Sequence, residues 1–475
     1  MTDTRDTPAA ANAGSPRGGA RLGPLTRKEL LTLIDRGALE TVVLAEIDHI
    51  GRLFGKRAEA RAFAAAPDEG MLTCSVNYAW DVRQEFAPGI EYAGWHTGYH
   101  DMWGRPDWAT ARVVPWAEKT ALVLCDTCTE AGAEIAVAPR TILRRQLERA
   151  RALGFRCEMA SELEFHVYAE PLEVVRRKHY RDLEPSVPAC QDYSILLQSP
   201  DEPFLAAVRR ALTDAGVPVE GSKGEYGWGQ TEVNLAHAEA MESADRHVLY
   251  KLGVKELARE HGRSVTFMAL PHAAGPEAGS SCHVHLSLWD EAGRNAFADA
   301  ADPSQSAPLM RHFLGGLMHC IPDLMPLYAP FINSYKRLRA EDFSPCTNAW
   351  GFDNRSVAFR MVGHGPSRRL ENRVPGADVN PYLAYAAMIG SGLYGIEHEL
   401  EPGLFAAGCA RTMPEAQALP GNLPAALARF VASDLAAEIL GGEVVRHLTR
   451  FAELEIDSYF STVTDWERET YFEQV

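Results

Sequence analysis

Alternating hydrophobic and polar positions identify one strand in the middle of the chain. Apolar side chains occupy every second position from Phe155 to Val167, with Ser161 as the one interruption. A period of two is typical of a half-buried β-strand. The opposite face then carries Glu162 and Glu164, whose carboxylates point the same way. Two such carboxylates repel each other unless protons or cations intervene, so this face is either a solvated surface or part of a charged site.

Three later segments, residues 230–235, 281–288 and 368–375, alternate in the same way. A sheet that gathers polar groups on one face is unfavourable unless it lines a hydrated, charged site. The four segments together therefore predict a site for metal ions and anions. The polar residues on the shared faces are Gln230, Glu232 and Asn234 in the first segment, His283, His285 and Ser287 in the second, and Arg369, Glu371 and Arg373 in the third.

Helical patterns with clear end signals surround these strands. Thr26 and Glu29 form a capping-box sequence for a helix that should end near Gly37. Pro139 stands at the favoured first position of another helix, which Gly154 should end. Further helices are expected at 203–215, 243–261 and 381–400 and within 423–459, a strand at 41–47, a glycine-rich loop containing Glu225 at 221–230, and a long loop at 333–351.

One further helix is expected after residue 305. Ser306 is the predicted N-cap, and the helix should end at about Cys320 because Pro322 follows.

The order of these elements predicts an α+β fold with two structured regions. Strands and helices are mixed without regular βαβ alternation. Residues 25–130 are interpreted as a small domain of about 100 residues, a common domain size, and residues 131–475 as a larger one. Residues 1–24 lack the apolar segment of a signal peptide and are expected to form a disordered tail.

Composition excludes several classes of partner. The chain has 475 residues and a net charge of −17 without a basic stripe, so no nucleic-acid partner is expected. No apolar run approaches the roughly 20 residues that span a bilayer, so no membrane partner is expected. Nine scattered cysteines suit a reducing cytoplasm. The CxxC pair Cys125 and Cys128 is interpreted as a strand end rather than a zinc or redox site.

Taken in order, the polar motifs resemble those of the glutamine synthetase superfamily. The resemblance extends from about Asp48 to the C-terminus. It implies a β-grasp-like N-terminal domain, a large α+β catalytic domain, and a homo-oligomeric ring, usually a dodecamer of two hexamers with active sites between neighbouring subunits. The motifs are Ser161–Phe165, Gly229–Glu232, Gly279-Ser280 leading to His283–His285, Asn333–Arg337, Trp350-Gly351 followed by Asn354-Arg355, and Arg369–Arg373.

The resemblance implies two divalent cations per site, Mg²⁺ or Mn²⁺, and ATP as a co-substrate. Five carboxylates and one imidazole would bind the cations, a hard, oxygen-rich set that suits these ions and not a structural zinc. One ion would be held by Glu164, Glu225 and Glu232, and the other by Glu162, His283 and Glu371.

The resemblance also implies the contacts to nucleotide and glutamate. Arginine suits both because its planar fork binds two oxygens at once. ATP would phosphorylate the γ-carboxylate of glutamate, and an amine would then attack the γ-glutamyl phosphate. The nucleotide-side residues would be His285, Ser287, Arg355, Arg360 and Arg369, the glutamate-side residues Gly279, Arg337 and Arg373, and the catalytic arginines Arg337, Arg355 and Arg373.

Two departures from the family favour an organic amine over ammonia. Phe343 stands where glutamine synthetases carry a glutamate, two residues before a proline, that helps to take a proton from ammonium. Residues 75–92, with Tyr78, Trp80 and Phe86, replace the stretch that supplies a second ammonium-binding carboxylate. An aromatic surface suits the hydrocarbon part of an amine. The chain therefore resembles the γ-glutamyl amide ligases that load polyamines, ethanolamine, isopropylamine or aniline onto glutamate.

Two other functions stay open. The chain could be an ammonia-using glutamine synthetase in which Glu341 or Asp342 takes the role of the missing glutamate, or a non-catalytic structural or regulatory relative. Complete retention of the metal and phosphate residues argues against the latter. Ala278, which replaces an asparagine that usually helps to bind glutamate, leaves the acid substrate less well defined.

Overall fold

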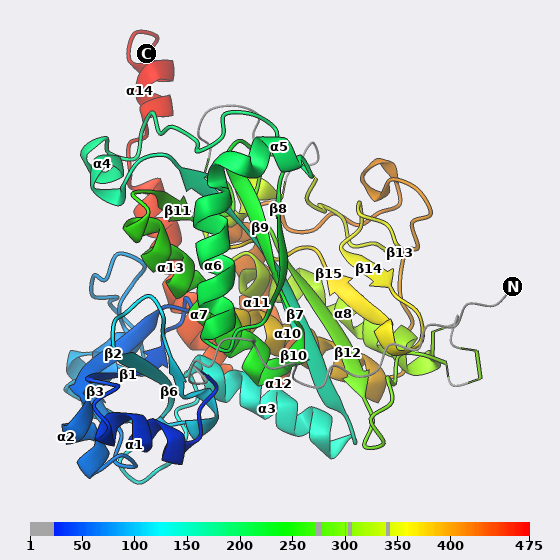
Figure 1. Cartoon of the computed structure of the whole chain (residues 1–475). Helices are drawn as coiled ribbons and strands as arrows, with labels where there is room; N and C mark the ends of the chain where they lie inside the picture. The colour runs from blue at the N-terminus through cyan, green and yellow to red at the C-terminus, as the bar shows by residue number, and fades with distance from the viewer. Residues whose placement is uncertain (1–22, 272–277, 300, 303–305, 339–342) are drawn as a thin grey trace, which may run out of the picture.

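The computed structural model describes residues 23–271, 278–299, 301–302, 306–338 and 343–475 (Figure 1). The tail predicted for residues 1–24 thus falls almost entirely outside the described residues, as do Glu341 and Asp342. Two mixed sheets with helices packed against them confirm the predicted α+β class. None of the described helices combines the length and apolar character needed to cross a membrane.

The first sheet belongs to the N-terminal region, coloured blue to cyan in Figure 1. Its strand order is β2-β1-β6-β4-β3, with β1 parallel to β6 and antiparallel to β2. Val42 and Leu44 pack under the two N-terminal helices, while Ala45 and Ile47 join the large core of the second region. The elements are α1 Arg27–Asp35, β1 Thr41–Ile47, β2 Leu53–Glu59, α2 Ala60–Ala65, β3 Met71–Cys74, β4 Asp101–Pro106, β5 Arg112–Val113 and β6 Thr120–Cys128.

Several local predictions in this region are confirmed. Thr26 and Glu29 form the capping box of α1 in both directions. β6 ends at Cys128, and Cys125 and Cys128 are both buried, as the interpretation of this pair as a strand end predicts.

The second sheet carries the polar faces and runs β13-β14-β15-β12-β7-β9-β8 across its width. The alternation from Phe155 onward predicts the long strand β7, which lies between β12 and β9, and Figure 1 shows it crossing beside them. The strands are β7 Arg156–Tyr168, β8 Val219–Gly224, β9 Gln230–Leu235, β10 Ala238–Glu239, β11 Ser264–Thr266, β12 Cys282–Trp289, β13 Trp350–Phe352, β14 Phe359–Val362 and β15 Arg369–Asn372.

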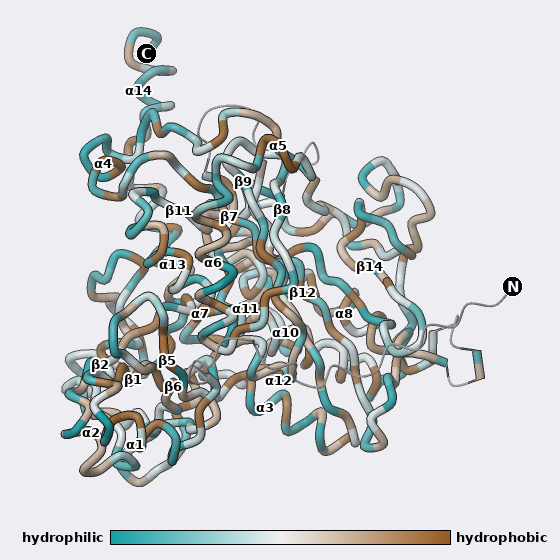
Figure 2. Tube along the Cα trace, viewed as in Figure 1, coloured by the Kyte–Doolittle hydropathy of each residue, from teal (hydrophilic) through white to brown (hydrophobic). Residues whose placement is uncertain are grey.

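Helices cover the apolar face of this sheet. Met159, Leu163 and Phe165 of β7 join one continuous core with α7 and α10. By contrast, α14 extends away from the body in Figure 1, carries hydrophilic residues in Figure 2, and has no buried residue. The helices are α3 Pro139–Ala152, α4 Leu172–Arg177, α5 Ile195–Gln198, α6 Glu202–Asp214, α7 Ala240–Glu260, α8 Pro308–Tyr328, α9 Ile332–Arg337, α10 Pro381–Glu397, α11 Leu423–Ala432, α12 Asp434–Leu440, α13 Gly442–Phe460 and α14 Asp465–Tyr471.

The prediction for the helix after residue 305 was wrong at both ends. Ala307 is the N-cap rather than Ser306, and α8 continues through Pro322 and Pro326 to Tyr328. A proline inside a helix leaves the carbonyl four residues earlier without its amide donor. Here Asn348 Nδ2 donates to the Met318 carbonyl at 2.7 Å, and Arg429 Nε donates to the Pro322 carbonyl at 3.2 Å. Because side chains from elsewhere satisfy both carbonyls, the helix continues.

Two predicted loops were also partly wrong. The segment 333–351 begins inside helix α9, whose first turn is held by Ser334: its hydroxyl donates to Asp378 at 2.6 Å and accepts the Phe331 amide at 3.0 Å. The first half of the glycine-rich segment 221–230 is the end of β8, which pairs with β9. For α9 the stabilising partner, Asp378, lies 44 positions along the chain, so local periodicity carried no signal. For β8 the partner is the next strand, β9, and the glycines at 221 and 224 obscured the alternation.

Two buried histidines lie where the first region meets α13. The His49 ring stacks on Phe451 with 3.5 Å between centroids, and His447 contacts the same ring edge-on at 5.1 Å. Within the described structure, neither ring nitrogen of His447 has a hydrogen-bond partner. Burial lowers the pKa of His447 to about 4 and holds the pKa of His49 well below its ordinary value.

These histidines predict a loss of stability in mild acid. Because the folded pKa of His447 is below its unfolded value of roughly 6.5, the unfolded state binds protons more tightly between about pH 6.5 and pH 4, and stability falls as the pH drops through this window. The linkage amounts to about 2 kcal/mol between pH 7 and pH 5 for one such residue. His447→Leu should remove that part of the pH dependence, measured by urea unfolding at both pH values. An unchanged pH dependence would show that His447 is already protonated in the fold.

Candidate active site

Strand register brings the predicted polar residues together. On β7, Glu162 lies opposite His283 of β12 and Asn234 of β9. Glu164 lies opposite Glu232 of β9. Directly opposed residues of antiparallel strands have Cβ atoms about 5 Å apart on the same face. β15 and β14 extend the same face, because Glu371 lies opposite both His285 and Arg360.

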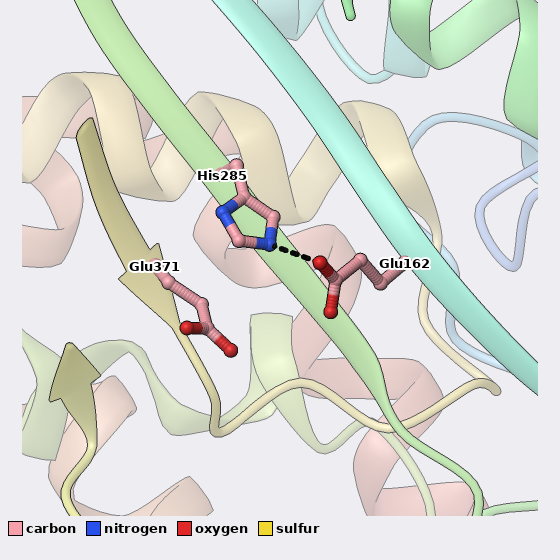
Figure 3. A group of neighbouring side chains, drawn as sticks. All are labelled: Glu162, His285 and Glu371. Atoms are coloured by element: carbon pink, nitrogen blue, oxygen red, sulfur yellow. Dashed lines mark ion pairs between the residues drawn. The ribbon is translucent and has the colours of Figure 1, made fainter. Parts of the chain in front are cut away.

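The first acidic cluster consists of Glu162, His285 and Glu371, which point toward one another in Figure 3. One potential ligand atom from each lies within 4.8 Å of the others, and His285 Nε2 is 3.0 Å from Glu162 Oε1. His283 also borders this cluster, with Nδ1 3.4 Å from Glu162 Oε2 and 3.5 Å from Glu371 Oε1. Both histidines therefore lie within reach of an ion bound between the two carboxylates.

The carboxylates of this cluster remain ionised. Glu371 is fully buried, which alone would raise its pKa, but His285, His283 and Arg373 lower that pKa to about 2. Burial would also raise the pKa of Glu162, and hydrogen bonds and charge from His283 and His285 reverse this effect. The cluster therefore presents negative charge at neutral pH.

The second acidic cluster consists of Glu164, Glu225 and Glu232, whose ligand atoms also lie within 4.8 Å of one another. Glu164 accepts hydrogen bonds from Gln230 Nε2 at 3.0 Å and from the Ser281 amide at 2.8 Å, which fix its carboxylate. Burial and the charge of Glu164 raise the pKa of Glu232 to about 7. Three close carboxylates with this repulsion are a favourable place for a cation.

The donor sets of both clusters fit divalent cations of the hard class. Carboxylate oxygens are the ligands that Mg²⁺ and Mn²⁺ prefer, and imidazole is compatible with Mn²⁺. A tetrahedral structural zinc would use cysteine and histidine ligands instead. The residues that would hold the ions are Glu164, Glu225 and Glu232 in one cluster, and Glu162 and Glu371 with His283 or His285 in the other.

A cavity of about 700 Å³ opens onto both clusters and is lined by four of the predicted arginines. Arg360 and Arg373 each donate to one Glu371 oxygen, at 2.8 and 2.5 Å. Arg337, at the end of α9, donates to the Val374 carbonyl at 2.8 Å, which ties α9 to the end of β15. The fourth is Arg355, which projects from the loop between β13 and β14.

A second cavity, of about 280 Å³, lies beside the first. Glu162 and Asn234 line both cavities. The structure thus divides the predicted nucleotide-side residues between two spaces: Arg355 and Arg360 line the large cavity, whereas His285, Ser287 and Arg369 line the small one. Arg369 Nε donates to His285 Nδ1 at 3.1 Å, which orients that ring.

Aromatic residues at the large cavity differ partly from the predicted ones. Phe343 and Gly279 line it as predicted for substrate residues. Tyr78 is buried and hydrogen-bonds Thr127, so it belongs to the core of the N-terminal region. Trp80 and Phe86 contact each other, with ring centroids 4.5 Å apart, and are not among the residues that line the large cavity of this chain.

The lining residues that escaped the sequence analysis include Tyr193, Lys223 and Tyr226. Lys223 stands two positions before Glu225 and lies near the end of β8, whose last residue, Gly224, directly precedes Glu225. Tyr226 directly follows Glu225. Tyr193 comes from a loop about which the polar pattern says nothing.

Comparisons with known proteins identify the family of the chain. Residues 136–471 match the family described as glutamine synthetase, catalytic domain. The chain is 42% identical over 456 residues to γ-glutamylethanolamide synthetase of Streptomyces coelicolor, covering 96% of this chain and 97% of the relative. It is 36% identical over 454 residues to a glutamate–isopropylamine ligase of a Pseudomonas species, covering 94% and 98%. A solved GmaS–ADP complex superimposes with a TM-score of 0.81 at 28% identity, covering 94% of this chain and 99% of that one. The chain therefore belongs to the glutamine synthetase family.

Proposed function

We propose that this protein is an ATP-dependent ligase that joins the γ-carboxylate of glutamate to an organic amine. The observation that carries the proposal is the shared cavity: the whole second acidic cluster, Glu162 and His283 at the first cluster, four arginines and a pair of exposed aromatic rings line one space. Two similar relatives are named for ligation of ethanolamine and isopropylamine to glutamate, which supports an organic amine as the acceptor.

The carboxylate of glutamate is a poor electrophile for attack by an amine. A carboxylate has no good leaving group, so ATP first converts it to a γ-glutamyl phosphate, and the amine then attacks this acyl phosphate and expels phosphate. Divalent cations, when bound, neutralise phosphate charge during the transfer. Arg355 and Arg360 would stabilise the transferred phosphoryl group, and Arg337 and Arg373 would orient the carboxylates of glutamate, because positioning and charge supply most of the catalysis in phosphoryl transfer.

The amine would enter beside Phe343 and Tyr226. Their rings meet edge to face with centroids 5.1 Å apart, and Phe343 is 68% exposed at the cavity. Burying the hydrocarbon part of an amine against these rings would remove apolar surface from water. Ammonium has no hydrocarbon part and would gain no such burial there, which favours an organic amine over ammonia.

Screening the amine tests the proposal directly. ADP release from ATP and glutamate should be measured with ammonia, ethanolamine, alkylamines, polyamines and anilines, with product identified by mass spectrometry. We expect at least one organic amine to give a higher kcat/KM than ammonia. A preference for ammonia over every amine would make the protein a glutamine synthetase, and no ADP release with any of them would make it a non-catalytic relative. The ring oligomer and the choice between Mg²⁺ and Mn²⁺ stay predictions from the family resemblance.

Phe343→Glu should change the amine preference. An ionised carboxylate beside the hydrocarbon part of an alkylamine must be desolvated, so kcat/KM for alkylamines should fall about tenfold. Ammonia-dependent glutamine formation should rise, because the carboxylate can attract ammonium and accept its proton. A polyamine should lose less, since its distal ammonium can pair with the new charge. The measurement is kcat/KM for each of the three acceptors.

The matched control is Phe352→Glu. Phe352 is 56% exposed and contacts Trp350 and Phe405, but it is not among the residues lining the large cavity. Its substitution should leave the ratio of alkylamine to ammonia activity unchanged. Equal effects of the two substitutions would show that Phe343 does not line the amine site.

A further inference from the structure

A lysine enters the second acidic cluster from the neighbouring strand. Lys223 of β8 lies opposite Glu232 of β9, which in turn lies opposite Glu164 of β7, so the three form one row across the sheet. Lys223 Nζ donates a hydrogen bond to Glu225 Oε1 and lies 3.9 Å from Glu232 Oε2. Its side chain is only 24% exposed.

The ammonium group of Lys223 counters the repulsion inside this cluster. Three carboxylates with oxygens within 4.8 Å of one another are unfavourable without a positive charge between them. Among the residues that the structure describes, Lys223 is the one basic side chain within ion-pair distance of Glu225 or Glu232. Its ammonium group therefore supplies the positive charge that a bound divalent cation would supply to these carboxylates.

We infer that Lys223 is a tethered competitor of the divalent cation at the Glu164, Glu225 and Glu232 cluster. It neutralises the cluster when no cation is bound and must withdraw when one binds, which lowers the affinity of this site for metal. The inference rests on the proposed function, in which this cluster holds a catalytic cation.

A second contact of Lys223 remains available to its ammonium group after displacement from the carboxylates. Lys223 Nζ lies over the Tyr193 ring, 4.8 Å from its centroid, and that ring is 69% exposed. The loop carrying Tyr193 is anchored to the same hairpin, because Gln191 Nε2 donates to the Gln230 carbonyl at 2.8 Å. After withdrawal from the carboxylates, the ammonium can retain the cation–π contact and gain water, so displacement does not leave a buried, unpaired charge.

Binding of Mn²⁺ to the metal-free, full-length protein tests this inference without any turnover. Free Mn²⁺ is measured by electron paramagnetic resonance during titration of the wild type and of Lys223→Gln. We expect one class of site to bind about tenfold more tightly in Lys223→Gln, because a charge-assisted hydrogen bond no longer has to break. Lys223→Arg keeps the positive charge and should bind more weakly than Lys223→Gln.

The matched control is Lys178→Gln. Lys178 pairs with Glu170 on the surface, so this variant removes a lysine from an ion pair outside the site and should bind Mn²⁺ like the wild type. If Lys223→Gln does not fold, Lys223→Met takes its place in the same titration. Unchanged or weaker Mn²⁺ binding in the folded variant overturns the role of Lys223 while leaving the ligase proposal intact. No Mn²⁺ binding by the wild type or the variant overturns the metal assignment of the ligase proposal itself, and the inference with it.

Discussion

Glu232→Ala is expected to abolish turnover while the protein stays folded. The substitution leaves Glu164 and Glu225 as the two carboxylates of a three-carboxylate cluster, so a bound cation would lose one of its ligands. We expect kcat to fall by about 10³ or more, since the cation that offsets phosphate charge would be bound loosely or lost. Folding should suffer little, because the substitution removes a carboxylate that repels Glu164. ADP release at saturating Mg²⁺ and the thermal midpoint measure the two effects.

Two further variants test whether the loss of turnover comes from the charge of Glu232. Glu232→Gln preserves the shape of the side chain and its contact with Asn234, which donates to Glu232 Oε1 at 2.8 Å, yet removes the charge. It should be as inactive as Glu232→Ala. Glu202→Ala removes a surface carboxylate that pairs with Arg209 and should retain normal turnover. Near-normal activity of either Glu232 variant would reject this cluster as a catalytic metal site.

Sequence alternation predicts which residues share a face, but not which strands become neighbours. The period of two correctly assigned Glu162 and Glu164 to the polar side of β7 and His283 and His285 to the polar side of β12. The contact between Glu162 and His283 joins residues 121 positions apart, and it depends on the register of β7 and β12. The residues of the site could therefore be proposed from the family resemblance. The distances between their side chains follow only from the pairing of the strands in the sheet.

The errors in the fold have different physical origins. Local end signals predict that α8 stops before Pro322, but side chains of Asn348 and Arg429 supply the missing hydrogen bonds, so tertiary partners override a local preference. β8 instead pairs with the next strand, β9, and its glycines hide a local alternation that includes Lys223.

Arg355→Ala should cost catalysis far more than stability. The Arg355 side chain is exposed on the loop between β13 and β14 and lines the large cavity, so its removal should not open a hole in the core. Its carbonyl accepts a hydrogen bond from Arg373 Nε at 3.2 Å, which ties this loop to the Glu371 side of the first cluster. Removing one preorganised charge donor at such a site typically lowers kcat by about 10²–10³. The measurements are kcat for ADP release and ATP affinity by calorimetry.

Arg355→Lys separates charge from geometry in the same experiment. Lysine restores the positive charge but not the two-pronged fork, so it should recover only part of the lost kcat, about tenfold over Arg355→Ala. Arg294→Ala is the control, because Arg294 pairs with Asp290 in the turn after β12 and is 76% exposed. If Arg355→Ala lowers kcat less than tenfold with ATP affinity unchanged, Arg355 has no role in stabilising the transferred phosphoryl group. The loop between β13 and β14 would then serve only to support Arg373, through the Arg355 carbonyl.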